Sequence, residues 1–437
     1  MKRLRRARLP ALARAIAVLL ALGSLASLLA GCGARVHTGG DTVAFLRDGT
    51  LWVILDDGTG ARAIAGNVAG YAWSPDHHAL AYRTTSGGSL ATLSATSSRR
   101  APDAPGGMWV ASISGGVPLQ LTPSESATFS DAWWNANGNR MVYRETGIPG
   151  MPIYVVSQAD QPVGIARKAL LDAAGLPVLS ADGQQVAAVD ADGALRLGAP
   201  GSLGSVIASH ALLTLPNTGR PAHLLWQPRT SALLYPASGA AGGITLTLIN
   251  TSGTARAAVT VPQLLDAAFS PDGSRLLVRT PDQFQLWRLG ATAPTFSWPE
   301  ADPEAMPWWS PNGQYVLVQD TAGWQLVDLA HQTVHSLLHA AKAPSSSIPA
   351  DEHPASRADW RPAAGSPWSA DGTRIVFAAA AGDTWRGAAL PGGASAGLYV
   401  APFAGGSFGA ASAIDNHADA APSWSYLDPS VTYLVSA

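Results

Sequence analysis

The stretch Phe269-Ser270-Pro271-Asp272-Gly273-Ser274-Arg275-Leu276-Leu277-Val278 decides the fold that we predict for this chain. It consists of the end of an apolar strand, four turn residues and a second apolar strand. Pro271 sets φ for the first turn position, Asp272 can accept hydrogen bonds from the backbone just ahead, and Gly273 tolerates a positive φ. The stretch therefore predicts a tight β-hairpin.

Seven further copies of this turn follow one another along the chain, about 40 to 60 residues apart. They lie at 73–76, 134–138, 179–183, 226–228, 309–313, 368–372 and, in a more degraded form, 424–428. Nearly every copy leads into an alternating apolar strand, and good copies continue with a third strand, a Gly-containing turn and a fourth. Four antiparallel strands at this period are typical of a β-propeller blade. We therefore predict an all-β fold with eight blades, or seven because the copies near Ser180 and Gln227 are degraded.

The N-terminal and C-terminal segments are each expected to supply part of one blade. Three short strands are expected within residues 42–65, but no turn copy precedes them. The last copy, near Trp424, is followed only by a possible strand at 431–435. Joining the N- and C-terminal strands in one blade would close the ring and leave no free sheet edge.

The repeats resemble those of the TolB-type propeller, a relative of the WD-type blade. The resemblance lies in the aromatic-Ser-Pro-Asp-Gly turns, in Leu398-Tyr399-Val400 and Trp109-Val110 as third strands, and in the Gly-Gly turns. The best copies are residues 268–289 and 308–327. The resemblance covers about residues 41–437, but the small α/β domain of TolB itself has no counterpart here. It implies the fold and does not transfer the role of TolB.

The first 31 residues have the pattern of an export signal. Six basic residues precede an apolar segment at 15–29, too short for a comfortable membrane span. Leu29-Ala30-Gly31-Cys32 resembles a bacterial lipobox, which implies cleavage before Cys32 and lipidation of its sulfur. A plain signal peptide or an anchor helix is the alternative. We expect a signal peptide at 1–31, a lipidated tether at 32–40 and a single propeller domain at 41–437.

The cysteine content and the net charge limit the internal bonds and the partners expected for this domain. Cys32 is the only cysteine, so no internal disulfide is expected. Removal of the leader leaves 22 basic and 30 acidic residues, a net charge of −8, which argues against nucleic acid. The membrane contact would be the acyl group on Cys32, at the outer side of the bacterial cytoplasmic membrane.

Three long segments interrupt the repeats at 84–107, 340–366 and 380–396. In an up-and-down blade they would all emerge on one side of the ring, and repeat proteins commonly bind through such a side. The alternative is that insertions persist where they do least harm. We name as binding candidates the polar and aromatic residues of these segments: Arg99, Arg100, Asp351, His353, Arg357, Trp360 and Trp385.

The tryptophans divide into two groups. Trp73, Trp134, Trp226, Trp309, Trp368 and Trp424 occupy equivalent repeat positions and are expected between blades. Trp298, Trp360 and Trp385 lie outside that pattern, so they are the candidates for exposed contacts, including stacking on sugars.

Motifs that could indicate chemistry have simpler interpretations. His331, His335 and His339 have helical metal-ligand spacing, but 333–338 is expected to be a strand. The Gly-x-Ser-x-Gly strings at 393–397 and 405–409 lack the strand-to-helix elbow of a hydrolase. Asp-rich turns near 56–58 and 190–193 lack a full calcium-ligand set. We expect no catalytic residue, metal or cofactor.

The sequence thus favours a non-enzymatic, lipid-anchored binding or scaffolding module whose partner is another envelope protein or a glycan. One alternative is a protein that captures a glycan or solute for a transporter or sensor. Another is an enzyme centred on the channel of the ring.

Overall fold

The computed structural model describes residues 42–74, 78–84, 88–89, 103–104, 107–121, 128–135, 137–146, 153–158, 168–170, 173–216, 218–219, 221–239, 242–300, 302, 305–320, 322–339, 366–380, 382–391, 397–415 and 423–424. Strands and turns make up nearly all of them, and no helix among them is long and apolar enough to cross a membrane. Cys32 and the expected signal and tether lie outside these residues.

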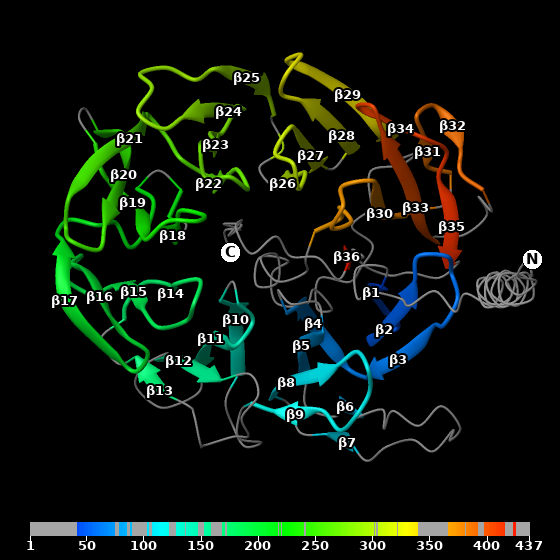
Figure 1. The fold of residues 1–437 in the computed structure, drawn as a ribbon, viewed down its shortest axis with the longest axis horizontal. Helices are drawn as coiled ribbons and strands as arrows, with labels where there is room; N and C mark the ends of the chain where they lie inside the picture. The colour runs from blue at the N-terminus through cyan, green and yellow to red at the C-terminus, as the bar shows by residue number, and fades with distance from the viewer. Residues whose placement is uncertain are drawn as a thin grey trace, which may run out of the picture. The chain divides into compact units, whose positions relative to one another are not determined.

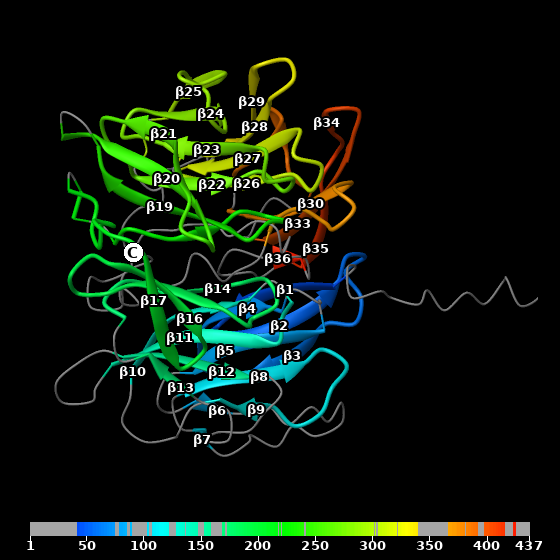
Figure 2. The same cartoon turned by 60° about the vertical axis from the view of Figure 1, so that its left-hand side comes forward.

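Apart from one two-stranded pair, the described strands form antiparallel sheets of four or more members, which we number as blades in chain order (Figures 1 and 2). Within a blade, strands A to D are hydrogen-bonded in that order. Blade 1 contains β36 (Ser423–Trp424), β1 (Thr42–Arg47), β2 (Thr50–Leu55) and β3 (Arg62–Ala65). Blade 2 contains β4 (Val68–Trp73), β5 (Ala79–Thr84), β8 (Gly107–Ser112) and β9 (Leu119–Gln120). Blade 3 contains β10 (Thr128–Trp134), β11 (Arg140–Thr146), β12 (Ile153–Gln158) and β13 (Lys168–Leu170).

The next three blades keep this order without interruption. Blade 4 contains β14 (Val178–Leu179), β15 (Val186–Val189), β16 (Leu195–Ala199) and β17 (Ser202–Ala208). Blade 5 contains β18 (Leu225–Trp226), β19 (Ala232–Ser238), β20 (Ile244–Asn250) and β21 (Ala255–Val261). Blade 6 contains β22 (Asp266–Phe269), β23 (Arg275–Arg279), β24 (Gln283–Arg288) and β25 (Phe296–Pro299).

The last two blades are elaborated. Blade 7 contains β26 (Met306–Trp309), β27 (Tyr315–Asp320), β28 (Gly323–Asp328) and β29 (Thr333–His339), extended by β31 (Thr384–Trp385) and β32 (Ala388–Ala389). Blade 8 contains β30 (Arg374–Ala379), β33 (Gly397–Ala404), β34 (Ser407–Phe408) and β35 (Ser412–Asp415), and a bridge from Trp368 to Ile375 takes the place of strand A. A separate pair, β6 (Gly88–Ser89) and β7 (Asp103–Ala104), lies between β5 and β8 in the chain.

Apolar clusters connect these eight sheets into a closed ring. Each pair of successive blades shares one cluster of buried residues, from blades 1 and 2 through to blades 7 and 8. An eighth cluster joins Val43 and Phe45 of blade 1 to Val376 and Leu398 of blade 8. The prediction of an all-β propeller with four-stranded antiparallel blades is therefore confirmed, and the eight sheets agree with the favoured count.

The last residue of strand A occupies the same place in successive blades. Trp73, Trp309 and Trp368 are fully or almost fully buried, each in the cluster shared with the preceding blade. Trp134 and Trp226 are half-buried against the corresponding clusters, and Leu179 and Phe269 fill this place in blades 4 and 6. Burial of such large side chains is the main stabilising contribution between blades. The expectation of inter-blade packing is correct for these five tryptophans, whereas the side chain of Trp424 lies outside the described residues.

The ring closes where the sequence predicts it to close. Strand β36 pairs with β1 through Val43 opposite Trp424 and Ala44 opposite Ser423. The C-terminal strand thus supplies strand A of blade 1, and the N-terminal strand supplies strand B. The possible strand at 431–435 lies outside the described residues.

The organising turn has one geometry in several blades. In blade 6, Ser270 Oγ donates to Asp272 Oδ1 at 2.6 Å and accepts the Arg275 N–H at 2.9 Å. Gly273, with φ of 72°, donates its N–H to the Ser270 carbonyl. Blades 4, 7 and 8 repeat the serine contacts. The turn therefore satisfies its polar groups locally and holds strands A and B in register.

Candidate binding face

The alternation of strand direction gives the ring two faces with different connections. We call the side with the A–B and C–D turns the turn face, and the side with the B–C and D–A connections the loop face. Because each blade is antiparallel throughout, every connection can be assigned to one face from the strand order alone.

The turn face is braced by contacts that run from one blade to the next. Gln227 Nε2 of blade 5 donates to the Gly273 carbonyl of blade 6 at 2.8 Å, and Arg275 of blade 6 donates to the Gly313 carbonyl of blade 7. Asn135 Nδ2 of blade 3 donates to the Ala181 carbonyl of blade 4 at 2.9 Å. These bonds link the turns of blades 3 and 4 and those of blades 5, 6 and 7.

The loop face carries the three long segments that the sequence singles out. Thr84 pairs with Gly107 across the B–C connection of blade 2, and Ala379 pairs with Gly397 across that of blade 8. The segment at 340–366 follows β29, a D strand, and therefore leaves from the same face. The candidates Arg99, Arg100, Asp351, His353, Arg357 and Trp360 lie outside the described residues.

The two faces also differ in charge among residues with described side chains. The loop-face ends of the strands and their connections carry ten carboxylates and five arginines: Asp48, Asp190, Asp192, Asp266, Asp282, Glu300, Asp302, Asp320, Asp383 and Asp415, with Arg47, Arg83, Arg196, Arg279 and Arg386. The turn face carries six carboxylates and seven arginines: Asp56, Asp57, Asp182, Asp272, Asp328 and Asp371, with Arg62, Arg140, Arg229, Arg256, Arg275, Arg288 and Arg374. The described part of the loop face is therefore acidic, whereas the turn face is nearly balanced.

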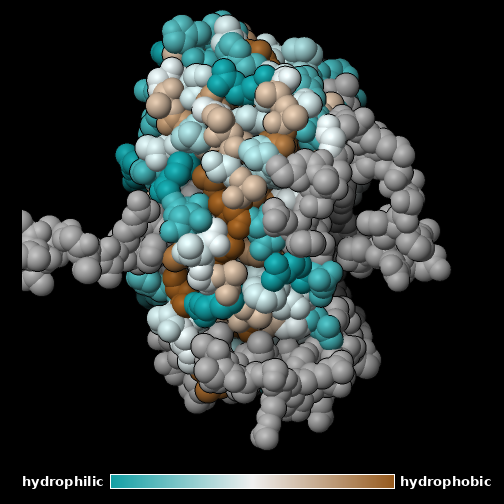
Figure 3. All heavy atoms as spheres, turned by 90° about the vertical axis from the view of Figure 1, so that its right-hand side faces the viewer, coloured by the Kyte–Doolittle hydropathy of each residue, from teal (hydrophilic) through white to brown (hydrophobic). Residues whose placement is uncertain are grey.

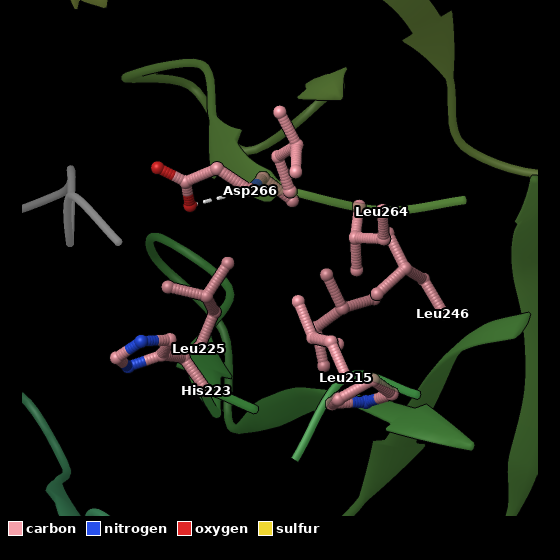
Figure 4. A pocket seen from close by; sticks show the side chains of 10 residues that line it. Leu215, His223, Leu225, Leu246, Leu264 and Asp266 are labelled. Atoms are coloured by element: carbon pink, nitrogen blue, oxygen red, sulfur yellow. Dashed lines mark hydrogen bonds between the residues drawn. The ribbon is translucent and has the colours of Figure 1, made fainter. Parts of the chain in front are cut away.

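A pocket opens on the loop face at the junction of blades 5 and 6 (Figure 4). The empty space beside its lining residues is about 290 Å³ when the adjoining open solvent is counted, and its wall includes Leu215, Leu225, Leu246 and Leu264. These leucines are buried, whereas the two polar lining residues, His223 and Asp266, are partly exposed. The polar residues therefore mark the mouth, and the leucines form the back.

The expectation of exposed tryptophans at 298 and 385 is wrong. Trp298 is 2% exposed and stacks on Phe284 at 5.3 Å between ring centroids. Trp385 is 4% exposed, stacks on Phe377 at 4.5 Å, and donates its indole N–H to the Gly409 carbonyl. Both lie outside the repeat position of the other tryptophans, but both fill apolar clusters all the same.

Trp385 is buried because its segment forms a strap between two blades. Strand β31 leaves blade 8 and pairs with β29 of blade 7, with Leu338 opposite Trp385 and His339 opposite Thr384. The Arg386 N–H extends this contact by donating to the Leu337 carbonyl at 2.6 Å. The described part of 380–396 therefore covers the outer edge of blade 7 and does not present Trp385 to solvent.

The three histidines whose spacing resembles that of metal ligands each contact a nearby side chain on their own segment. His331 Nδ1 lies 2.8 Å from Asp328 Oδ2, His335 contacts Thr333, and His339 contacts Ser336. No three His, Cys, Asp or Glu side chains of the described residues are placed to hold a metal ion. The string at 405–409 begins with the two-residue turn of the β33–β34 hairpin and continues through β34, so it is not a strand-to-helix elbow.

Large exposed apolar side chains are few in the described part of the chain: Val117, Val206 and Val334. Figure 3 shows one side of the molecule, where apolar residues form a narrow strip between polar ones. No broad apolar surface marks a binding site on that side.

The comparisons with known proteins agree with the fold. No family model matches the chain, and no curated protein matches its sequence. A solved eukaryotic initiation factor structure superimposes with a TM-score of 0.51 at 10% identity, covering 88% of this chain and 98% of that one. The C-terminal WD40 domain of Sif2 has a TM-score of 0.47 at 13% identity, covering 67% of this chain and 79% of that one. The β-propeller domain of Myceliophteria thermophila Cps50 (Swd1) has a TM-score of 0.41 at 11% identity, covering 62% of this chain and 86% of that one. At these identities the likeness concerns the fold alone, and it agrees with the β-propeller that the strand order shows.

Proposed function

We propose that this protein is a non-enzymatic binding or scaffolding module that contacts its partner through the loop face. The observation that carries the proposal is that the strands flanking the three long segments end on that face, while hydrogen bonds between blades brace the turn face. A rigid ring that presents connections of variable length on one side suits recognition.

We further propose that the ring is held outside the cytoplasmic membrane by lipid on Cys32, as the lipobox-like sequence implies, and that its repeats are of the TolB type. The test is Cys32→Ser with metabolic labelling by a fatty acid. The variant should lose the label and leave the membrane fraction. Retained labelling would show that the assignment of Cys32 is wrong.

The glycan-capture alternative loses part of its support. It relied on exposed tryptophans at 298, 360 and 385, and two of these are buried in apolar clusters. We therefore place a protein partner ahead of a glycan.

The loop-face proposal is tested by shortening one connection. Because Thr84 and Gly107 pair directly, residues 85–106 can be replaced by a two-residue Asn-Gly turn that keeps the ladder. The full chain, tagged and expressed in its native membrane, is crosslinked, and the captured proteins are compared with those of the shortened variant. We expect the shortened variant to lose specific crosslinks at unchanged circular dichroism.

The matched control alters the turn face. Val117, which is 94% exposed in the C–D turn of blade 2, is replaced by Glu. This variant should keep the crosslinks. Identical crosslinks from the shortened variant, or their loss in Val117→Glu alone, would contradict the proposal.

A further inference from the structure

The pocket between blades 5 and 6 has the features of an anchor site. Its leucines come from separate strands and connections: Leu225 from β18, Leu246 from β20, and Leu215 and Leu264 from the D–A connections. In Figure 4, the His223 ring and the Asp266 carboxylate lie on one side of the pocket, and Leu215, Leu246 and Leu264 lie on the other. An entering group would thus pass two polar side chains before it reached an apolar wall.

His223 has hydrogen-bonding capacity that the described part of the chain does not use. Its Nε2 is buried and has no hydrogen-bond partner there. Burial also lowers the pKa of His223 to about 4, so the ring is neutral near pH 7. A buried polar atom without a partner is costly, and a ligand that supplies one recovers that cost. A neutral imidazole can accept a hydrogen bond from a backbone or side-chain N–H.

The surroundings of the pocket favour a cationic ligand. Asp266 stands at the mouth, and Asp282, Glu300, Asp302 and Asp320 occupy the loop-face ends of blades 6 and 7. Burial raises the pKa of Glu300, and the charges of Asp320 and Asp302 raise it further, while a backbone hydrogen bond from Asp302 and the charge of Arg279 oppose part of this rise. The carboxylates of this region therefore repel one another, and a positively charged partner would reduce this repulsion.

The arginine among these carboxylates is directed toward backbone oxygens. Arg279 is 5% exposed; its Nη1 donates to the Ala305 carbonyl at 2.5 Å, and its Nη2 donates to the Asp302 carbonyl. It holds the D–A connection of blades 6 and 7 in place. One buried guanidinium among five carboxylates leaves the region acidic.

We propose that this pocket takes a branched aliphatic side chain from a basic segment of a partner protein, with the flanking lysines or arginines over the carboxylates of blades 6 and 7. This inference rests on the proposed function only in assuming that the loop face is the binding face. Shape selects the aliphatic group, His223 Nε2 accepts an N–H of the segment, and charge selects against acidic partners.

The test uses the full chain and three synthetic peptides. The first is acetyl-Lys-Lys-Leu-Lys-Lys-amide, the second has Gly in place of Leu, and the third has Glu in place of every Lys. Binding is followed through the ¹³C-methyl resonances of the leucines. We expect the first peptide to shift the pocket methyls, the second to bind about tenfold or more weakly, and the third not to bind. Raising the salt concentration from 50 to 500 mM should weaken the first peptide several-fold.

Two protein variants locate the site. Ala267→Leu fills the pocket from its wall and should abolish the methyl shifts. His223→Asn should weaken binding several-fold, whereas His210→Asn, an exposed position on the same connection, should not. The thermal transition of each variant is measured first. If Ala267→Leu has lost its cooperative transition, Ala267→Val is used in its place.

The outcomes separate this inference from the proposed function. No methyl shift with the first peptide, equal binding of the Glu peptide, or unchanged binding by Ala267→Leu would overturn the pocket assignment. If the crosslinks still depended on 85–106, the loop face would stand as the binding face without this anchor. If the pocket bound the peptide but the crosslinks did not depend on residues 85–106, the pocket assignment would be supported and the proposed function would be contradicted.

Discussion

The interface between blades 5 and 6 and the interface between blades 8 and 1 show two ways of holding neighbouring sheets together. Blades 5 and 6 follow each other in the chain, and a cluster of sixteen buried residues joins them. Blades 8 and 1 meet where the ends of the chain are joined, and their cluster has six buried residues among the side chains that the structure describes. Within this described part, the closing interface therefore has less apolar burial than the interface between blades 5 and 6.

Ion pairs partly replace that burial at the closing interface. Arg47 of β1 lies 3.1 Å from Asp415 of β35 on the loop face, and Arg374 of β30 pairs with Asp56 of blade 1 on the turn face. Arg47 also lies 4.0 Å from the Trp52 ring centroid. The blade 5–6 interface relies on apolar packing and contains His223, whose Nε2 is buried. We therefore expect the two interfaces to respond differently to truncation, acid and salt.

The largest expected effect is that of removing a core aromatic ring from the larger cluster. Phe269→Ala should lower the free energy of unfolding by about 3–5 kcal/mol, because Phe269 is 1% exposed and a cavity would remain. Phe45→Ala, in the smaller cluster, should cost less and should speed amide exchange in blades 1 and 8 before the rest of the ring. Urea denaturation and hydrogen exchange measure both. Equal costs, with exchange raised evenly around the ring, would show that the closing interface is not weaker.

Acid should act on the blade 5–6 interface through His223. Its pKa is lowered from 6.5 to about 4, so the neutral ring stabilises the fold fully above pH 6.5, and this contribution falls as the pH drops from 6.5 to 4. At about 1.4 kcal/mol per pH unit, the loss approaches 3 kcal/mol. Asp266 lines the same pocket and is the acidic group whose charge would offset part of this loss.

The variant His223→Gln should have a flatter stability curve across this pH range, measured by urea denaturation at each pH. The matched variant His335→Gln, on the exposed face of β29, should keep the steep curve. If the wild type and His223→Gln changed in parallel with pH, the assigned role of His223 would be wrong.

Salt should act on the closing interface. The double variant Arg47→Gln, Arg374→Gln removes both ion pairs and should cost about 1–2 kcal/mol at low ionic strength. The cost should shrink when the salt concentration is raised, because the wild-type pairs are partly exposed and are screened. Arg288→Gln, at an exposed position of blade 6, is the control and should cost little. A cost that did not depend on salt would indicate that the arginines act through packing.

Repetition explains what could be predicted from the sequence. The turn copies fix the blade order, and the tryptophans at the end of strand A were correctly expected between blades because the same position recurs. Joining the two ends was also predictable, because one blade lacked strand A and another copy lacked its following strands.

Residues outside the repeated turn motif could not be placed in this way, because no equivalent position recurs along the chain. Trp385 was expected to be exposed because it lies in an insertion, but its burial depends on β31 pairing with a strand of the preceding blade. The pocket depends on Leu215 and His223, which lie in the D–A connection between blades 4 and 5, outside the repeated turn motif. Single-sequence patterns report local periodicity, and these contacts are formed by segments that meet only in the folded ring.

The smallest expected effect compares two turn glycines with the same backbone strain but different surroundings. Gly49 in blade 1 has φ of 65° and nothing near its missing Cβ, so Gly49→Ala should cost about 1 kcal/mol from φ alone. Gly273 has φ of 72°, and a Cβ there would lie 2.9 Å from the Pro228 carbonyl oxygen of blade 5. Gly273→Ala should therefore cost about 1 kcal/mol more, because the added methyl group must push two blades apart. Equal costs in urea denaturation would show that the turns adjust independently, and that stacking of successive turns does not brace this face of the ring.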